Sequence, residues 1–133
     1  MSHVATPSSV RHLNPNVLPD DLSAQCESWI DAMTLLMADG EGYFILPGGT
    51  EISALCHQAR VAARRAERRL CTLNKLDALP AQIMSYINRL SDLFFTMARY
   101  DLHLAGASEE RWQAFGYKRK RREDVAENRG EGN

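Results

Sequence analysis

Hydrophobic residues recur every three or four positions in three stretches of this 133-residue chain, and that spacing predicts three amphipathic helices. Asp20 or Asp21 is expected to cap the first helix. Thr50 caps the second, and Pro80 opens the third, which covers roughly residues 81–104. The expected core positions of the first and third helices are Leu22, Cys26, Trp29, Ile30, Met33, Met37, Ile83, Ile87, Leu90, Phe94 and Met97. The pattern therefore predicts an all-α fold, a helical bundle.

The second helix, expected to run to about Leu73, carries two different stripes. The mostly basic stripe consists of His57, Arg60, Arg64, Glu67 and Arg68. The stripe of mostly small apolar residues, expected to pack into the core, consists of Leu55, Ala59, Ala62, Ala66 and Leu70. Neighbouring guanidinium groups repel one another, and within this segment Glu67 alone offsets them, so the basic stripe predicts a bound polyanion. The planar fork of arginine suits phosphate oxygens, which makes a triphosphate the expected ligand. A solvated or ion-paired surface is the alternative for such a helix taken alone.

The composition narrows the possible functions. The formal net charge of −1 provides no global basic field, so nucleic acid is not an expected partner. Three cysteines without CxxC spacing fit buried thiols in a reducing compartment, and the four histidines are scattered, so we expect no disulfide and no metal site. No apolar run reaches the length of a membrane span. We therefore expect a soluble cytoplasmic protein that binds a discrete ligand and does not enter a membrane.

The chain divides into three parts along its length. Residues 1–19 lack periodicity and are expected to form an irregular lead-in, residues 20–115 form one helical domain, and residues 116–133 form a basic and then acidic disordered tail without a site. Between the first two helices, the apolar residues 43–46 need a cover or a ligand. Because three helices make a thin bundle, self-association is expected to provide that cover.

Three segments then point to a family. FILPGG (residues 44–49), HQARVAARRAER (residues 57–68) and YINRLSDLFFTMAR (residues 86–99), in this order and at these separations, closely resemble the PduO-type ATP:cob(I)alamin adenosyltransferases. The resemblance covers roughly residues 20–112. It implies a homotrimer of helical bundles that binds ATP and a corrinoid at clefts between neighbouring subunits. The implied reaction transfers the 5′-deoxyadenosyl group of ATP to cob(I)alamin and releases triphosphate.

The resemblance assigns cofactor-binding roles to four residues. Arg64 and Arg68 match arginines that contact ATP. Glu67 matches the acidic residue between them, which lies close to the nucleotide and its magnesium. Asn88 matches an asparagine that contacts the nucleotide. These four residues are therefore the expected ATP site.

Two further residues are expected to act in catalysis. Arg60 matches an arginine that pairs with an aspartate of the adjacent subunit, and Phe44 matches an aromatic residue that packs against the lower face of the corrin and keeps dimethylbenzimidazole off cobalt. By contrast, Asp92 is expected to pair with Arg89 or with a neighbouring subunit rather than with a ligand. His57 is interpreted as a hydrogen-bonded core residue and not as a cobalt ligand.

One departure from the family affects the expected activity. Members open with a segment of the form TKTGDxGxT, which wraps the phosphates of ATP, and with another long helix, and neither occurs in this sequence. The resemblance therefore implies an N-terminally truncated form that binds ATP weakly. Two main interpretations stay open: an enzyme whose reading frame is shortened, or a catalytically impaired corrinoid-binding or interaction module. A structural helical subunit without a ligand is a third.

Overall fold

The computed structural model describes residues 5–14, 19, 21–37 and 45–109. In these ranges it contains one 3-10 helix, η1 (Ser8–Leu13), and three α-helices: α2 (Leu22–Met37), α3 (Glu51–Asn74) and α4 (Ala81–Leu104). The all-α prediction is confirmed, and the three α-helices lie where the hydrophobic pattern places them. The boundary expected at residue 115 and the tail beyond it lie outside the described residues.

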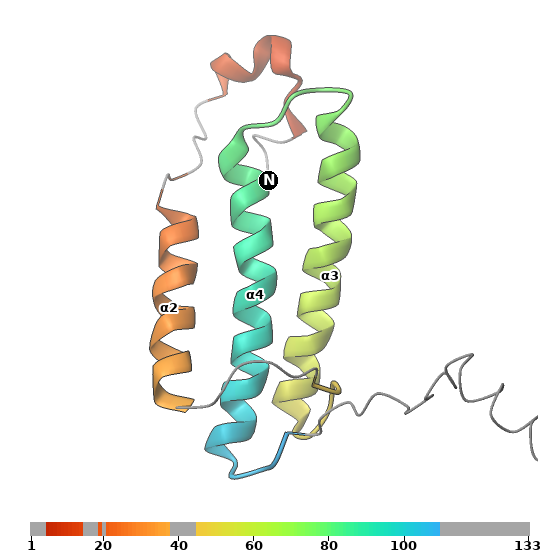
Figure 1. Ribbon diagram of the computed structural model, residues 1–133. Coiled ribbons are helices and arrows are strands. Elements are labelled where there is room, and N and C mark those ends of the chain that lie inside the picture. Colours follow the sequence, from red (N-terminus) through yellow and green to blue (C-terminus); the bar gives the residue numbers. More distant parts are fainter. Residues whose placement is uncertain (1–4, 15–18, 20, 38–44, 110–133) are drawn as a thin grey trace, which may run out of the picture.

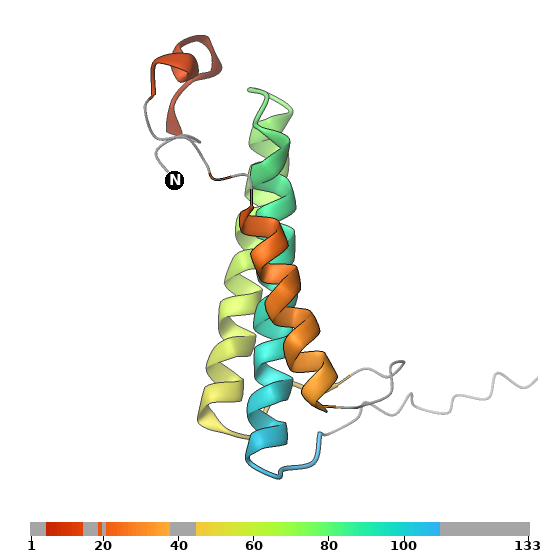
Figure 2. The ribbon, with the colours of Figure 1, turned by 90° about the vertical axis from the view of Figure 1, so that its left-hand side faces the viewer.

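The central helix of the fold is α4, which lies between α2 and α3 and packs against both (Figures 1 and 2). Its buried side chains include Ile83, Leu93 and Leu102, and Ala98 has no exposed surface. Burial of these apolar groups is the main driving force that holds the neighbouring helices against α4. The arrangement is a thin bundle, as the count of predicted helices implied.

Polar contacts align α2 with the first half of α4. The Ser23 and Ser85 hydroxyl groups are 3.2 Å apart, within hydrogen-bond distance. Arg89 on α4 lies 3.1 Å from a carboxylate oxygen of Glu27 on α2. Both of these side chains are substantially exposed, so the ion pair fixes the orientation of α2 more than it stabilises the fold.

The expected core is only partly buried. Cys26 and Met37 of α2 are buried, but Trp29 is 54% exposed and Met97 of α4 is 38% exposed. Cys71, expected to be a buried thiol, is exposed. The physical reason is that α2 packs against a single neighbouring helix among the described residues, which covers a narrower stripe than a full bundle would cover.

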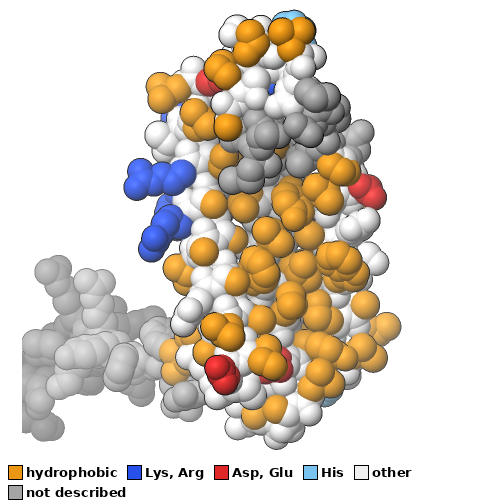
Figure 3. All heavy atoms as spheres, turned by 180° about the vertical axis from the view of Figure 1, so that it is seen from behind, with side chains coloured by type: hydrophobic (Ala, Val, Ile, Leu, Met, Phe, Trp, Pro, Cys, Tyr) orange, Lys and Arg blue, Asp and Glu red, His pale blue; other side chains and the backbone are white. Residues whose placement is uncertain are grey.

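Apolar side chains gather on one face of the molecule. Figure 3 shows this face from behind, with hydrophobic side chains spread over its middle and Lys or Arg side chains at the edge formed by α3. Large hydrophobic residues that are exposed in the structure include Trp29, Leu35, Leu36, Ile52, Leu55 and Val61. Apolar surface of this extent is typical of faces that pack against another protein surface.

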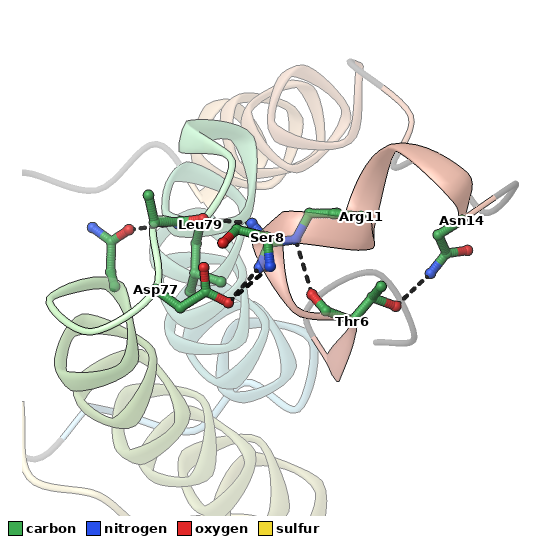
Figure 4. Close-up of polar contacts among 8 residues, drawn as sticks. Thr6, Ser8, Arg11, Asn14, Asp77 and Leu79 are labelled. Atoms are coloured by element: carbon green, nitrogen blue, oxygen red, sulfur yellow. Dashed lines mark hydrogen bonds and ion pairs between the residues drawn. The ribbon is translucent and has the colours of Figure 1, made fainter.

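Part of the expected lead-in, Ser8–Leu13, forms the short 3-10 helix η1. Arg11 of η1 is only 9% exposed and is held by the connection between α3 and α4 (Figure 4). Its guanidinium donates to the carbonyl oxygens of Ala78 and Thr6, and to Asp77 Oδ2 at 3.3 Å. The Ser8 amide also donates to Asp77 Oδ2, at 3.1 Å. Hydrogen bonding from Ser8, and then the Arg11 charge, lower the pKa of Asp77 despite the opposing effect of burial.

Candidate functional site

The loop that precedes α3 is tied to the start of that helix and to the end of α4. Thr50 is the N-cap of α3, and its hydroxyl accepts a hydrogen bond from the Ser53 amide at 3.0 Å. The same hydroxyl bonds to the carboxylate of Asp101 on α4. The buried Ser53 hydroxyl donates to the Gly48 carbonyl at 3.1 Å. The predicted cap is confirmed, and these bonds fix the end of the FILPGG segment against both helices.

Gly49 allows the same loop to approach α4 closely. Its φ of +101° lies in the region that favours glycine, and a Cβ added there would clash with the Leu102 side chain. A larger residue at this position would therefore adopt a strained backbone conformation and require the Leu102 side chain to move. Phe44, the expected corrin-facing residue at the start of this segment, lies outside the described residues.

The residues of the basic stripe predicted for α3 differ in their burial. His57 is buried and Arg60 and Glu67 are half-buried, whereas Arg64 and Arg68 are exposed. Leu55 and Ala62, which belong to the apolar stripe predicted to pack into the core, are also exposed. The face that meets α4 instead carries the buried residues Ser53, Cys56, His57 and Ala63. The prediction of one apolar face and one arginine face was therefore wrong.

Side-chain size explains this correction. Ser53 and Ala63 are small enough to let the α3 backbone approach α4 closely, and that approach buries the long side chains at the margin of the contact. The two predicted stripes each contain residues at spacings of three and four, so the spacing alone could not identify the stripe that meets α4. An arginine-rich helix also offers few large apolar residues that would fix its orientation.

Two of the four residues expected at the nucleotide are in direct contact. The Asn88 amide nitrogen on α4 donates to Glu67 Oε1 on α3 at 3.0 Å. The Ser91 hydroxyl donates to the Asn88 carbonyl at 2.8 Å. Arg64 and Arg68 lie three residues before and one residue after Glu67 on α3, at exposed positions. The structure thus brings Glu67 and Asn88 together beside two exposed guanidinium groups.

A second cluster surrounds Arg60. Its guanidinium carbon lies 4.7 Å from the centre of the Phe95 ring, and His57 meets the same ring edge-on at 6.2 Å between centres. Burial, followed by the nearby Arg60 charge, lowers the pKa of His57, so this imidazole is neutral at pH 7. His57 Nδ1 has no hydrogen-bond partner among the described residues. In the described part of the chain, Arg60 forms no ion pair.

An ion pair between Arg89 and Asp92 lies on α4, in the turns before Phe95. Asp92 Oδ2 accepts a hydrogen bond from Arg89 at 3.2 Å, which confirms the predicted structural pairing. The contact between Phe95 and Arg60 was not predicted from the sequence. The available signal was that Phe95 is an aromatic residue at a position where Asp92 and Arg99, three before and four after it, are charged. Arg99, further along α4, pairs with Glu109 at 2.6 Å.

Arg60 also lines a groove of 490 Å³ between α3 and the loop that leads into it. The loop contributes Pro47 and Gly48, and α3 contributes residues that include His57, Val61 and Arg65. A volume of this size is within the range of small-molecule sites. In the described residues, no group of three or more His, Cys, Asp or Glu side chains is placed to hold a metal ion.

Comparison with known proteins identifies the family. The sequence model described as cobalamin adenosyltransferase matches residues 1–101 of this chain. The chain belongs to the cobalamin adenosyltransferase family. Among curated members, the human corrinoid adenosyltransferase MMAB is 38% identical over 112 residues, which cover 82% of this chain and 44% of that protein. The Bacillus subtilis corrinoid adenosyltransferase is 50% identical over 56 residues, covering 42% of this chain and 29% of that protein. The chain thus spans less than half the length of these two relatives.

Solved adenosyltransferases share the fold. A Phe-to-Ala variant of the PduO-type ATP:corrinoid adenosyltransferase from Lactobacillus reuteri, complexed with cobalamin and ATP, is similar with a TM-score of 0.76 and 31% sequence identity. The match covers 83% of this chain and 60% of that one. No helix in the described ranges has both the length and the apolar character needed to cross a membrane.

Proposed function

We propose that this chain is a corrinoid adenosyltransferase, which transfers the 5′-deoxyadenosyl group of ATP to cob(I)alamin and releases triphosphate. The observation that carries the proposal is the hydrogen bond between Asn88 and Glu67, formed beside the exposed Arg64 and Arg68. These four residues come from two helices and were expected at the nucleotide. The cobalamin and ATP complex of the Lactobacillus reuteri relative adds support.

The proposed reaction needs no general base. The cob(I)alamin cobalt attacks ribose C5′, a cobalt–carbon bond forms, and the bond between C5′ and the triphosphate oxygen breaks with its electron pair leaving on triphosphate. Cobalt changes formally from Co(I) to Co(III). The protein must hold C5′ in line with cobalt and stabilise the charge on the departing triphosphate. Arg64 and Arg68 suit the second task because guanidinium groups stay charged and bind phosphate oxygens.

The proposed roles of the remaining residues follow from their positions. Glu67 Oε1 accepts from Asn88, which leaves its second carboxylate oxygen available to a magnesium ion or to a water molecule bound to it. We assign Arg60 to the cleft between subunits, because it carries a charge without an ion pair in the described part of the chain. Phe44 is assigned to the lower face of the corrin.

The proposed assembly is a homotrimer located in the cytoplasm, with each cleft formed by two subunits. The exposed apolar side chains on the face in Figure 3 support self-association, because such a face is costly to leave in water. Sedimentation equilibrium or light scattering at micromolar concentration tests this assembly. A compact, well-folded monomer would contradict it.

The activity is tested without air, using cob(I)alamin, ATP and magnesium, by the change in corrin absorbance as adenosylcobalamin forms. The 133-residue chain is compared with a fusion that places a phosphate-binding segment of the family before Met1. Recovering a few kcal/mol of oriented phosphate contacts should raise the rate of the fusion by at least about a hundredfold. Absence of turnover by both proteins would overturn the enzymatic proposal and leave a corrinoid-binding or interaction module.

A further inference from the structure

Side chains of α3 and α4 meet at one aromatic ring. The Arg60 guanidinium carbon lies 4.7 Å from the centre of the Phe95 ring, and the His57 ring meets Phe95 edge-on at 6.2 Å between centres. His57 is only 6% exposed, and its Nδ1 atom has no hydrogen-bond partner among the described residues. His57 and Arg60 lie one turn apart on α3 and share this ring, so a charge on one acts on the other.

The surroundings of His57 oppose its protonation. Burial, followed by the Arg60 charge, lowers the pKa of His57. On α4, the charged residues within two turns of Phe95 already have partners in the structure: Asp92 with Arg89, Arg99 with Glu109, and Asp101 with Thr50. The loop before α3 contributes Pro47 and Gly48, which carry no charge. Among the described residues, Arg60 is therefore the charge that acts against a proton on His57.

The same two residues line the groove at the start of α3. Its lining also contains Arg65 and small apolar side chains, and no described residue of the lining carries a carboxylate. Val61 lines the groove and keeps 58% of its surface exposed. An exposed apolar wall with two guanidinium groups is complementary to a protein surface that carries a carboxylate. A second copy of the chain offers exposed carboxylates, such as that of Asp31.

We propose that His57 takes up a proton from solvent when a neighbouring copy of the chain packs against Arg60, so that assembly is linked to pH. This inference rests on the proposed function, which places Arg60 in the cleft between subunits. A carboxylate bound to Arg60 offsets the charge that opposes protonation of His57. The proton bonds to a ring nitrogen, and no other bond breaks. Because the linkage is reciprocal, assembly that takes up a proton becomes tighter as pH falls.

The pH range follows from the two states of His57. In the separate chain its pKa lies below the ordinary value of about 6.5, so the imidazole is neutral at pH 7. In the assembly its pKa is higher than in the separate chain, so association depends on pH in the interval between these two pKa values. Above this interval both forms are neutral, and below it both are protonated. Each pKa unit between the two values changes the association constant about tenfold.

Sedimentation equilibrium of the full chain, from about pH 8 to about pH 5.5 at constant ionic strength, tests the linkage. The association constant should rise on the order of tenfold as pH falls. His57→Gln keeps a polar side chain that cannot take up a proton in this range, so its association should not depend on pH. His103→Gln is the matched control, because His103 is exposed on α4 outside the groove, and it should keep the rise.

A titration of the imidazole groups by NMR measures the coupling without assembly. Arg60→Met keeps the apolar stem of the side chain and removes its charge, so the pKa of His57 should rise in the separate chain. Arg69→Met removes an exposed charge of α3 outside the groove and should leave the pKa of His57 unchanged. Circular dichroism checks that each variant retains its helices.

Several results would overturn the proposal. Association that does not change with pH, or that changes equally in His57→Gln, would exclude the linkage and leave the proposed assembly and reaction intact. An unchanged pKa of His57 in Arg60→Met would exclude it as well. A chain that stays monomeric at every pH would contradict the proposed assembly and this inference together, while adenosylation separately tests the reaction. If ATP raises the pKa of His57 in a monomeric chain, a ligand and not a second copy binds Arg60.

Discussion

The guanidinium of Arg60 lies over the face of the Phe95 ring, 4.7 Å from its centre, and this contact joins the middle of α3 to α4. His57 packs edge-on against the same ring at 6.2 Å, so the ring is held from a second direction. The Arg60 charge is thereby fixed in place without an ion pair among the described residues. A guanidinium group held in this orientation is positioned to bind an anionic group of a ligand or of a neighbouring subunit.

The first prediction concerns Phe95 as a positioning residue. Phe95→Leu keeps an apolar side chain but removes the ring face, so Arg60 loses its orientation. We expect the adenosylation rate to fall on the order of threefold to thirtyfold, the range of a cation–π contact, while Phe95→Tyr retains activity. Phe94→Leu is the matched control at a half-buried neighbouring position.

A double-mutant cycle separates this role from general packing. If Phe95 acts through Arg60, then Phe95→Leu should cost little further activity once Arg60→Ala is present. Fully additive losses in the cycle would mean that Phe95 only stabilises the contact between α3 and α4. Circular dichroism and thermal unfolding of each variant check that the fold is retained.

The second prediction concerns the exposed arginines of α3. If Arg64 binds phosphate, Arg64→Ala should weaken ATP or triphosphate binding by about 1.5–3 kcal/mol, with helix content unchanged. Arg69→Ala removes the same charge from another exposed position of α3 and should have a much smaller effect. Similar losses in the two variants, measured by calorimetry, would indicate a diffuse electrostatic attraction and no specific phosphate site.

The third prediction separates two properties of Glu67. Glu67→Gln keeps an acceptor oxygen for the Asn88 amide but removes the negative charge. The free energy of unfolding should therefore be nearly unchanged, while the affinity for ATP in the presence of magnesium should fall about tenfold. Asn88→Ala should instead lower both stability and ATP affinity, because it leaves the half-buried carboxylate without its donor. If Glu67→Gln binds the ATP–magnesium complex normally, the carboxylate has a structural role alone.

The helices could be read from the sequence because their signals are local. Thr50 satisfies the free amides at the start of α3 and Pro80 directly precedes α4, and both signals depend on a few neighbouring residues. The three motifs that resemble the family likewise carried the assignment, because each retains its residues in order. Local capping and motif order thus predicted the fold and the family, and the roles expected for the site residues stay predictions.

The orientation of α3 could not be predicted, because it depends on which residues fit against α4. Ser53 and Ala63 decide that contact by being small, a property that hydrophobicity does not report. The contact between Arg60 and Phe95 also joins residues 35 positions apart, which no helical spacing relates. The burial of Arg11 could not be predicted either, since an arginine in a segment without periodicity gives no sign that it packs against the connection between α3 and α4.

The fourth prediction concerns the dependence of stability on pH. Burial and the Arg60 charge lower the pKa of His57 in the folded protein. As pH falls below about 6.5, the unfolded chain takes up a proton that folded His57 does not, so the free energy of unfolding decreases until the folded pKa is reached. Above about pH 6.5, His57 does not contribute to the change of the free energy of unfolding with pH. His57→Gln should flatten this part of the pH profile in urea titrations, and exposed His103→Gln should not. An unchanged profile in His57→Gln would contradict the burial argument.

The last prediction concerns the contact that holds η1 against the connection between α3 and α4. Arg11 donates to the carbonyl oxygens of Thr6 and Ala78 and to Asp77, so Arg11→Met removes a charge and several hydrogen bonds while keeping an apolar stem. We expect η1 to open more often while α3 and α4 stay folded, because local openings in proteins occur independently of global unfolding.

Amide hydrogen exchange measures this opening at Val10 and Asn14, whose amides donate to carbonyl oxygens within the η1 segment. Their exchange should accelerate on the order of tenfold in Arg11→Met, the scale of one hydrogen bond to a charged group. In the unchanged protein the protection of these amides, relative to the intrinsic exchange rate at the same pH, should likewise decrease as pH falls through the lowered pKa of Asp77, because protonation removes the charge that Arg11 binds. Lys75→Met, which removes an exposed charge at the end of α3, is the control and should leave exchange at Val10 unaltered. Equal acceleration in both variants would mean that net charge, and not the Arg11 contact, holds η1 in place.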